Sequence, residues 1–165
     1  MTNAIHQSLL QEIGQSLDID LEFDENHQCF LLLDEQLMVS IRSLDDAWVF
    51  YGMVGNLYPE DVDEGDAAQQ NDETENTAQA LLSLNLSQAE SGGASIAMQK
   101  SSGVIMLVLR VATIGMYSLG MKDRLAGFVD QLKATIATLN GETEVPEKEA
   151  ALPVFPLATG FFERA

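Results

Sequence analysis

Apolar runs separated by acidic pairs fill residues 31–58, and they restrict the fold more than any other feature. The stretch reads LLLDEQLMVSIRSLDDAWVFYGMVGNLY, and the pairs Asp34-Glu35 and Asp45-Asp46 interrupt it. Acidic pairs favour turns, whereas runs of aliphatic, β-branched and aromatic residues favour strands. Connections this short leave no room for a crossover helix, so the runs predict antiparallel strands.

The spacing of apolar residues predicts the remaining elements. Apolar residues recur every four positions near the start of the chain, as on one face of a helix, and alternate in 37–41, as on one face of a strand. In chain order we expect a helix beginning at residue 2 or 3 and ending near 17, strands at 21–23, 29–33, 37–41 and 47–54, a helix from residue 72 or 74 to about 89, strands at 94–100 and 104–113, and a helix at about 122–139.

These elements predict an α+β fold in which an antiparallel, twisted sheet of about five strands packs with three helices. The order is helix, three to four strands, helix, two strands, helix. The domain is expected to span residues 1–141, with an acidic, solvated loop at 59–76. Residues 142–165 read as a flexible tail, or as a segment whose aromatic residues dock into a groove on this or a neighbouring subunit. Those aromatic residues are Phe155, Phe161 and Phe162.

Charge narrows the possible partners. The chain has 26 acidic and 8 basic residues, a formal net charge of −18, which disfavours nucleic acid and anionic membranes and favours solubility. Its longest apolar run, 104–109, falls far below the roughly 20 residues of a membrane-spanning helix. The first 41 residues contain no Lys or Arg to begin a signal peptide. We therefore expect a cytoplasmic protein.

Catalytic and metal-binding patterns are scarce. His6 and His27 have no metal-ligand spacing, and the single cysteine, Cys29, sits in an apolar strand pattern that suits a buried thiol. The acidic stretch DVDEGD suggests a calcium loop, but from Asp61 the glycine falls at the fifth place instead of the sixth. We expect no enzyme and no cofactor or metal, although acidic pairs brought together by the fold would leave an enzyme as a third reading.

Residues 23–57, FDENHQCFLLLDEQLMVSIRSLDDAWVFYGMVGNL, carry a family resemblance. They resemble the strand block of CesT/Tir-type class I type III secretion chaperones in four features. These are an acidic residue near the end of the first strand, an apolar run into LD, a strand ending near an acidic pair, and the pattern YG-x-VG-x-L. The resemblance extends over roughly residues 3–139. The loop at 59–76 is longer than the family's usual connection, and the apolar tail after Gly141 has no family counterpart.

The resemblance implies a cytoplasmic bacterial homodimer without ATP hydrolysis of its own. Such a dimer binds the N-terminal segment of one or more secreted effectors in extended form. It keeps them soluble and delivers them to the export apparatus, where the secretion ATPase strips them away. An extended peptide can add to a sheet edge while its alternate side chains fill apolar pockets.

Apolar residues of the first helix and strand block are the candidates for effector binding: Ile5, Leu9, Ile13, Phe30, Leu32, Met38, Trp48 and Phe50. The family's dimer contact implies self-association through Leu81, Leu82, Leu84, Leu86, Ile96 and Met98. Methionines adapt to varied partners, which adds Met53 and Met106 to the candidates. An alternative is an acidic adaptor or inhibitor that binds a folded basic protein through the 59–76 loop.

Overall fold

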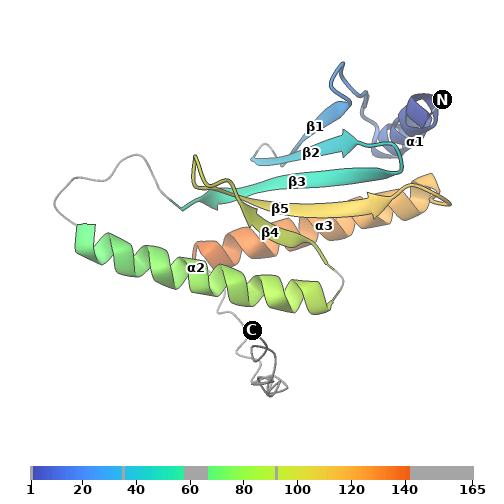
Figure 1. Ribbon diagram of the computed structural model, residues 1–165. Helices are drawn as coiled ribbons and strands as arrows, with labels where there is room; N and C mark the ends of the chain where they lie inside the picture. The colour runs from blue at the N-terminus through green and yellow to red at the C-terminus, as the bar shows by residue number, and fades with distance from the viewer. Residues whose placement is uncertain (1, 35, 58–66, 92, 142–165) are drawn as a thin grey trace, which may run out of the picture.

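The structure is a computed structural model that describes residues 2–34, 36–57, 67–91 and 93–141. Three helices and five strands form one α+β unit, which confirms the expected fold class (Figure 1). In chain order the elements are α1 (Thr2–Leu17), β1 (Gln28–Leu33), β2 (Leu37–Ser43), β3 (Ala47–Asn56), α2 (Ala67–Glu90), β4 (Ser95–Met98), β5 (Val104–Ala112) and α3 (Ser118–Leu139).

The five strands form a single antiparallel sheet in the order β1-β2-β3-β5-β4. Tight turns join β1 to β2 and β2 to β3, at the two acidic pairs that the sequence marks. Asp34 takes a left-handed conformation there (φ 52°), which Asp tolerates better than most residues. β1 and β4 are therefore the edge strands of the sheet.

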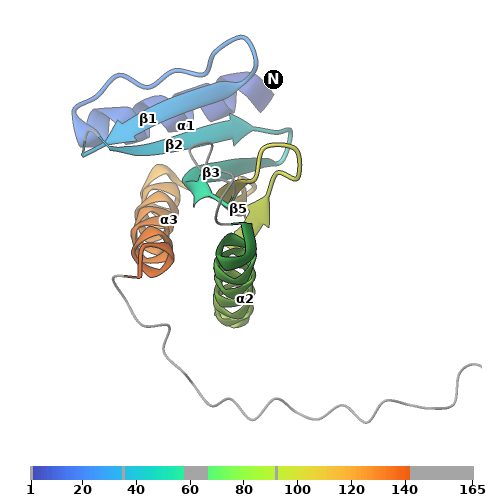
Figure 2. The same ribbon diagram turned by 90° about the vertical axis from the view of Figure 1, so that its left-hand side faces the viewer.

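All three helices pack on one face of the sheet, here called the inner face. Figure 1 shows α2 and α3 running together beneath the strands, and Figure 2 shows α1 behind β1 and β2. One row of paired residues crosses this face from edge to edge: Leu31, Val39, Gly52, Leu107 and Ile96. As alternation predicts, odd-numbered residues of β2 are buried, and this row forms the centre of the core.

Helix α3 approaches the sheet closely because β3 carries glycine at two points of contact. A Cβ atom on Gly52 would collide with the methyl groups of Leu132, and one on Gly55 would lie 2.7 Å from Leu139 Cδ2. Beside them, the rings of Phe50 and Phe128 pack 5.6 Å apart between centroids. The two glycines of YG-x-VG-x-L thus set the depth at which α3 packs against the sheet.

Helix α2 packs against β4 and α3. Its Leu81 is buried, and Gln88 donates a hydrogen bond of 3.1 Å to Thr135 Oγ1 of α3. The Asn85 side chain accepts the backbone N–H of Ile96 at 2.8 Å, so α2 lies along the outer edge of β4 and occupies one of its edge donors.

Three expectations about element bounds need correction. Residues 21–23 are not a strand, because Asp24 Oδ1 accepts the backbone N–H groups of Asn26 and Gln28 at 2.8 Å and fixes a local turn instead. Helix α2 begins at Ala67, within the stretch expected to be a loop, because its Ala and Gln residues are good helix formers. Helix α3 begins four residues earlier than expected, at Ser118. Residues 59–66 and the tail at 142–165 lie outside the described residues.

Candidate functional site

The face of the sheet opposite the helices is apolar and open. We call it the outer sheet face. It is formed by Phe30, Leu32, Met38, Tyr51, Met53, Met106 and Val108. Phe30, Leu32, Met38 and Met53 are each more than half exposed, at 56–63%. Isolated apolar residues on a surface are ordinary, but a contiguous apolar area marks a binding surface.

Strand register makes this face continuous. Phe30 pairs with Ser40, Ser40 with Tyr51, and Tyr51 with Val108, while Leu32 pairs with Met38 in the neighbouring row. Cross-strand partners have Cβ atoms about 5 Å apart, so these side chains form one surface.

Acidic residues are excluded from this surface. The chain has 26 of them, yet none falls within the five strands that the structure describes. The charged residues in the strands are Arg42 and Arg110, both on the outer sheet face, and Arg110 pairs with Asp46 at 2.8 Å. Negative charge therefore surrounds the outer sheet face without covering it, which keeps the chain soluble while the face stays apolar.

The edge next to the outer sheet face is also open. β1 pairs with β2 on one side and, in the described part of the chain, with no strand on the other. In β4 the N–H of Ile96 is taken by Asn85 of α2. Figure 2 shows α1 behind β1 and the segment that joins them passing above it, but no strand of the described residues pairs with this edge of β1. An open edge strand beside an apolar face is the geometry that accepts an extended peptide by backbone pairing.

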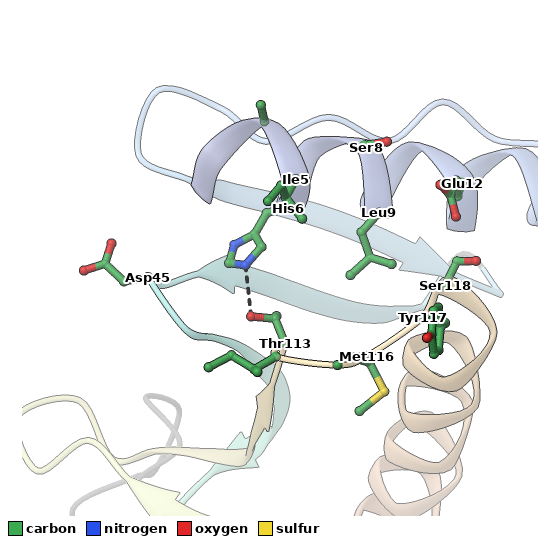
Figure 3. Close-up of a pocket in the computed structure, with 13 residues that line it drawn as sticks. Ile5, His6, Ser8, Leu9, Glu12, Asp45, Thr113, Met116, Tyr117 and Ser118 are labelled. Carbon is green, nitrogen blue, oxygen red and sulfur yellow. Dashed lines mark hydrogen bonds between the residues drawn. The ribbon is translucent and has the colours of Figure 1, made fainter. Parts of the chain in front are cut away.

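A second apolar surface lies between α1 and the loop that joins β5 to α3. This α1 groove encloses about 680 Å³, and Figure 3 shows its side chains converging from both elements. Three large apolar residues at or beside its rim are strongly exposed: Ile5 (68%), Ile114 (85%) and Tyr117 (82%). Leu9 and Met116 line its inner wall, while Glu12 and Asp45 contribute negative charge.

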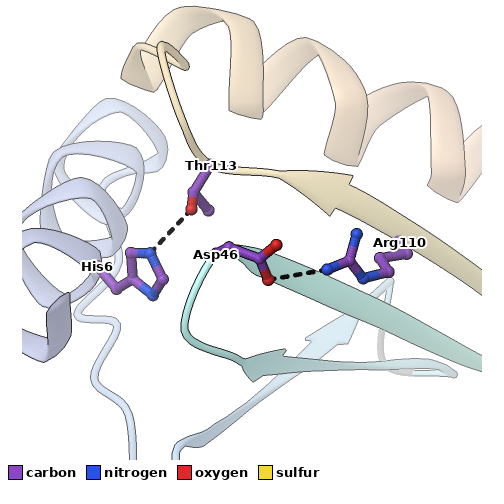
Figure 4. Close-up of polar contacts among 4 residues, drawn as sticks. All are labelled: His6, Asp46, Arg110 and Thr113. Carbon is purple, nitrogen blue, oxygen red and sulfur yellow. Dashed lines mark hydrogen bonds and ion pairs between the residues drawn. The ribbon is translucent and has the colours of Figure 1, made fainter.

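His6 fixes one wall of the α1 groove. Its Nε2 lies 3.0 Å from Thr113 Oγ1, directly after β5 (Figures 3 and 4), and its Nδ1 lies 2.6 Å from Ser43 Oγ at the end of β2. One buried imidazole therefore ties α1 to both strands. Its ring also packs edge-on against Trp48. Burial lowers the pKa of His6, and the negative charge of Asp45 opposes that shift in part. His6 is accordingly a structural residue, and its neutral imidazole holds α1 in place.

A third apolar surface, the α2–β4 groove, contains several of the residues predicted for self-association. Leu81, Leu82, Ile96 and Met98 line it together with Leu57, Ala78, Asn85, Ala97 and Ile105. Leu82 is 69% exposed and Met98 is 45% exposed, whereas Leu81 is buried. Leu86, one helical turn after Leu82, is also exposed, and Leu84 is partly buried. The structure thus gathers four of the six predicted residues around one groove.

The eight residues predicted for effector binding separate into three groups. Phe30, Leu32 and Met38 lie together on the outer sheet face, and Ile5 and Leu9 line the α1 groove. In contrast, Ile13, Trp48 and Phe50 are in the core, where at most 1% of each is exposed. Those three face inward because the pleat and the helical repeat turn them toward α3 and the sheet, so they leave the candidate site.

Sequence reasoning missed part of both surfaces. Tyr51 and Val108 complete the outer sheet face, and their alternation with buried neighbours in β3 and β5 was the available signal. Ile114, Tyr117 and Leu119 beside the α1 groove fell between expected elements. Gly115, which has a φ of +73°, marks the turn that presents them.

No group of three or more potential metal ligands occurs among the described residues. Cys29, in β1, is buried, and burial raises the pKa of its thiol, which disfavours the reactive thiolate. Of the helices that the structure describes, none has both the length and the apolarity to cross a membrane.

An open apolar sheet face beside an open edge strand defines a class of protein, namely a small α+β protein built to hold another polypeptide. Its family follows from the sequence: the model of the Tir chaperone protein (CesT) family matches residues 8–135, and the chain belongs to this family.

Solved structures share the fold. A chain of the HopA1-SchA chaperone-effector complex superimposes with a TM-score of 0.64 at 17% identity, covering 82% of this chain and 96% of that one. The type III secretion chaperone SycH of Yersinia pestis, in complex with a stable fragment of YscM2, gives 0.54 at 19% identity, covering 79% and 98%. A chain of the heterodimeric ExoU-SpcU complex from the type III secretion system of Pseudomonas aeruginosa gives 0.52 at 16% identity, covering 84% and 97%.

Proposed function

We propose that this chain is a type III secretion chaperone that binds the N-terminal segment of one or more effector proteins in extended form. Membership of the Tir chaperone family supports the class, and the outer sheet face supports the mode of binding. The effector segment adds a strand to the edge of β1, and its alternate side chains pack against Phe30, Leu32 and Met38. Bound in this way, the effector stays soluble and competent for export.

The observation that carries the proposal is the contrast between an apolar sheet face and the acidic chain around it. A face with four large apolar side chains more than half exposed would favour aggregation in a protein of low charge. The net charge of −18 keeps unloaded copies apart, yet leaves the face available to an apolar client.

Self-association is assigned to the α2–β4 groove. Leu82, Leu86 and Met98 expose apolar surface there, on the opposite edge of the sheet from β1. A homodimer formed through this groove leaves both copies of β1 and of the outer sheet face open for one long effector segment. We infer a cytoplasmic bacterial protein without catalytic activity, which passes its client to the export apparatus and its ATPase.

Capture from the native bacterium tests the proposal. The full chain is tagged and purified from cytoplasm, its partners are identified by mass spectrometry, and the bound material is trimmed with protease. A protected N-terminal effector segment with about two copies of this chain per client is the expected result. Recovery of a folded basic protein that moderate salt releases would instead support an adaptor acting through residues 59–76.

Two matched substitutions locate the binding surface. Met38→Asp places a charge on the outer sheet face and should abolish recovery of the effector while the chain remains folded. Gln36→Asp adds the same charge at an exposed position in the adjacent β1–β2 turn and should leave recovery unchanged. Equal recovery of the effector with both variants would mean that the effector does not bind the outer sheet face.

A further inference from the structure

We propose that the apolar part of the chain's own C-terminal tail, residues 150–162, covers the outer sheet face when no effector is bound. These thirteen residues read AALPVFPLATGFF and contain no charge. They follow eight residues, 142–149, that contain four Glu and one Lys. The tail is thus a charged spacer followed by an apolar segment, which is the composition of a tethered occupant for an apolar surface.

The point at which the tail leaves the domain favours this surface. Near its C-terminal end, α3 packs Leu139 beneath Gly55, and earlier its Lys133 pairs with Asp34 at 2.8 Å in the β1–β2 turn. Figure 1 shows this end of α3 at the same end of the sheet as that turn. Leu32 and Met38 flank the turn directly, so the spacer begins on the helix side of the sheet, at the end that carries Leu32 and Met38, and far from the α1 groove, which lies by the N-terminal end of α3.

The length of the tail fits the path around the sheet. Eight extended residues reach about 26 Å, whereas the layers of a packed sheet are about 10 Å apart, so residues 142–149 can pass from the helix side to the outer side. Four gaps between five strands span about 19 Å, and a six-residue polyproline-type segment at about 3.1 Å per residue has the same length. The segment 152–157, LPVFPL, can therefore cross the whole face.

Proline positions indicate that the tail lies across the face and does not extend the edge of β1. Pro153 and Pro156 are three residues apart, so in a strand their nitrogen atoms would point to opposite sides. One of the two would then face β1 without an N–H to donate, which breaks the ladder. In a polyproline-type helix, residues three apart share a side, so Leu152 and Phe155 would share the side that contacts the face.

Charge admits the tail to the outer sheet face, as it does to the α2–β4 groove, which the proposed homodimer occupies. Apolar residues gain nothing over an acid-rich surface, and the strands that form the outer sheet face contain no acidic residue in the described structure. Covering the face by the tail would protect unloaded chaperone from association, and an effector segment would displace the tail on binding. Displacement of the tail by an effector rests on the proposed function. Contact between the tail and the outer sheet face does not depend on it.

Methionine side chains give each apolar surface its own reporter. Met38 and Met53 lie on the outer sheet face, Met98 lines the α2–β4 groove, Met116 lines the α1 groove and Met121 is in the core. The test is a methyl NMR spectrum of the full chain labelled with ¹³C at its methionine methyl groups. The spectrum is compared with those of Phe155→Asp and of Thr143→Asp, a control that adds the same charge within the spacer.

We expect Phe155→Asp to shift the Met38 and Met53 signals and to leave those of Met98, Met116 and Met121 in place, while Thr143→Asp shifts none of them. Shifts at Met98 or Met116 would place the tail in another groove, and an unchanged spectrum would mean that it covers nothing; either result overturns the proposal. If the tail covers the face nine-tenths of the time, Phe155→Asp should also bind the effector segment recovered by capture about tenfold more tightly. The methyl spectrum needs no effector, so it can fail while the chaperone function stands.

Discussion

Phe50 and Phe30 lie on opposite faces of the same sheet, and their surroundings differ completely. Phe50 is fully buried against Phe128 of α3, whereas Phe30 is 59% exposed on a face without helices. Both belong to the same apolar strand block of the sequence. The difference shows that the apolar strand residues have two roles: those on the inner face stabilise the fold, and those on the outer sheet face are available to another chain.

The matched pair Phe50→Ala and Phe30→Ala tests this comparison with the largest expected effect. Removing the buried ring of Phe50 should lower the free energy of unfolding by about 3–5 kcal/mol, since both burial and packing are lost. Removing the exposed ring of Phe30 should change it by no more than about 1 kcal/mol, because that ring is not packed in the core. Urea unfolding at one protein concentration measures both, and a loss of about 3–5 kcal/mol for Phe30→Ala as well would show that its ring is packed as tightly as that of Phe50.

The glycines of β3 and α3 provide the next pair. Gly52→Ala should lower the free energy of unfolding by about 1–3 kcal/mol, because its Cβ atom would collide with Leu132 on the inner face. Gly127→Ala, in the exposed part of α3 where a Cβ would meet nothing within 4 Å, should raise it by up to about 1 kcal/mol. Chemical unfolding should therefore give opposite signs, and equal signs would mean that α3 does not pack on β3 as described.

His6 should make stability depend on pH. Its pKa is lowered in the folded chain from the ordinary 6.5, so the unfolded chain binds a proton first as the pH falls. Stability is then retained above 6.5 and declines below it, until the folded-state pKa is reached. His6→Asn should cost about 1–2 kcal/mol near neutral pH through its two side-chain hydrogen bonds.

The pH series supplies its own control. As the pH falls below 6.5, the difference in unfolding free energy between the natural chain and His6→Asn should shrink, because the variant lacks the group that is protonated. A constant difference across the series would mean that His6 is not held in its neutral form.

The ion pair between Arg110 and Asp46 should contribute least. Both side chains are more than half exposed, at 55% and 59%, so solvent screens their attraction. Asp46→Asn is expected to change the unfolding free energy by less than about 0.5 kcal/mol in the same urea experiment. A larger loss would show that the outer sheet face depends on this contact for its structure.

Sequence patterns predicted the sheet well because strand periodicity is local. Alternation in 37–41 placed Val39 and Ile41 on a common face, and the structure buries both. Where side chains competed with the backbone, prediction failed, as at Asp24, whose carboxylate fixes a turn beside the expected strand 21–23. The sequence predicts a loop over 59–76, yet α2 begins at Ala67, because the Ala and Gln residues at its start are good helix formers.

The candidate site was only partly predictable, for a different reason. Alternation shows which residues share a face, but both faces of this sheet are apolar, so it does not show which one the helices cover. The sequence therefore groups Trp48 and Phe50 with Phe30, although the structure buries both on the inner face. Which face is covered depends on the position of α3, and α3 is placed by contacts between residues far apart in the chain, such as Gly52 with Leu132.

Hydrogen–deuterium exchange of the chain with and without a captured effector segment tests the central claim most directly. If the segment pairs with the open edge and packs on the outer sheet face, amide exchange should slow in β1 and β2, residues 28–43, while α3 stays unchanged. Protection confined to α2 or to residues 59–76, with unchanged exchange in β1, would contradict the account.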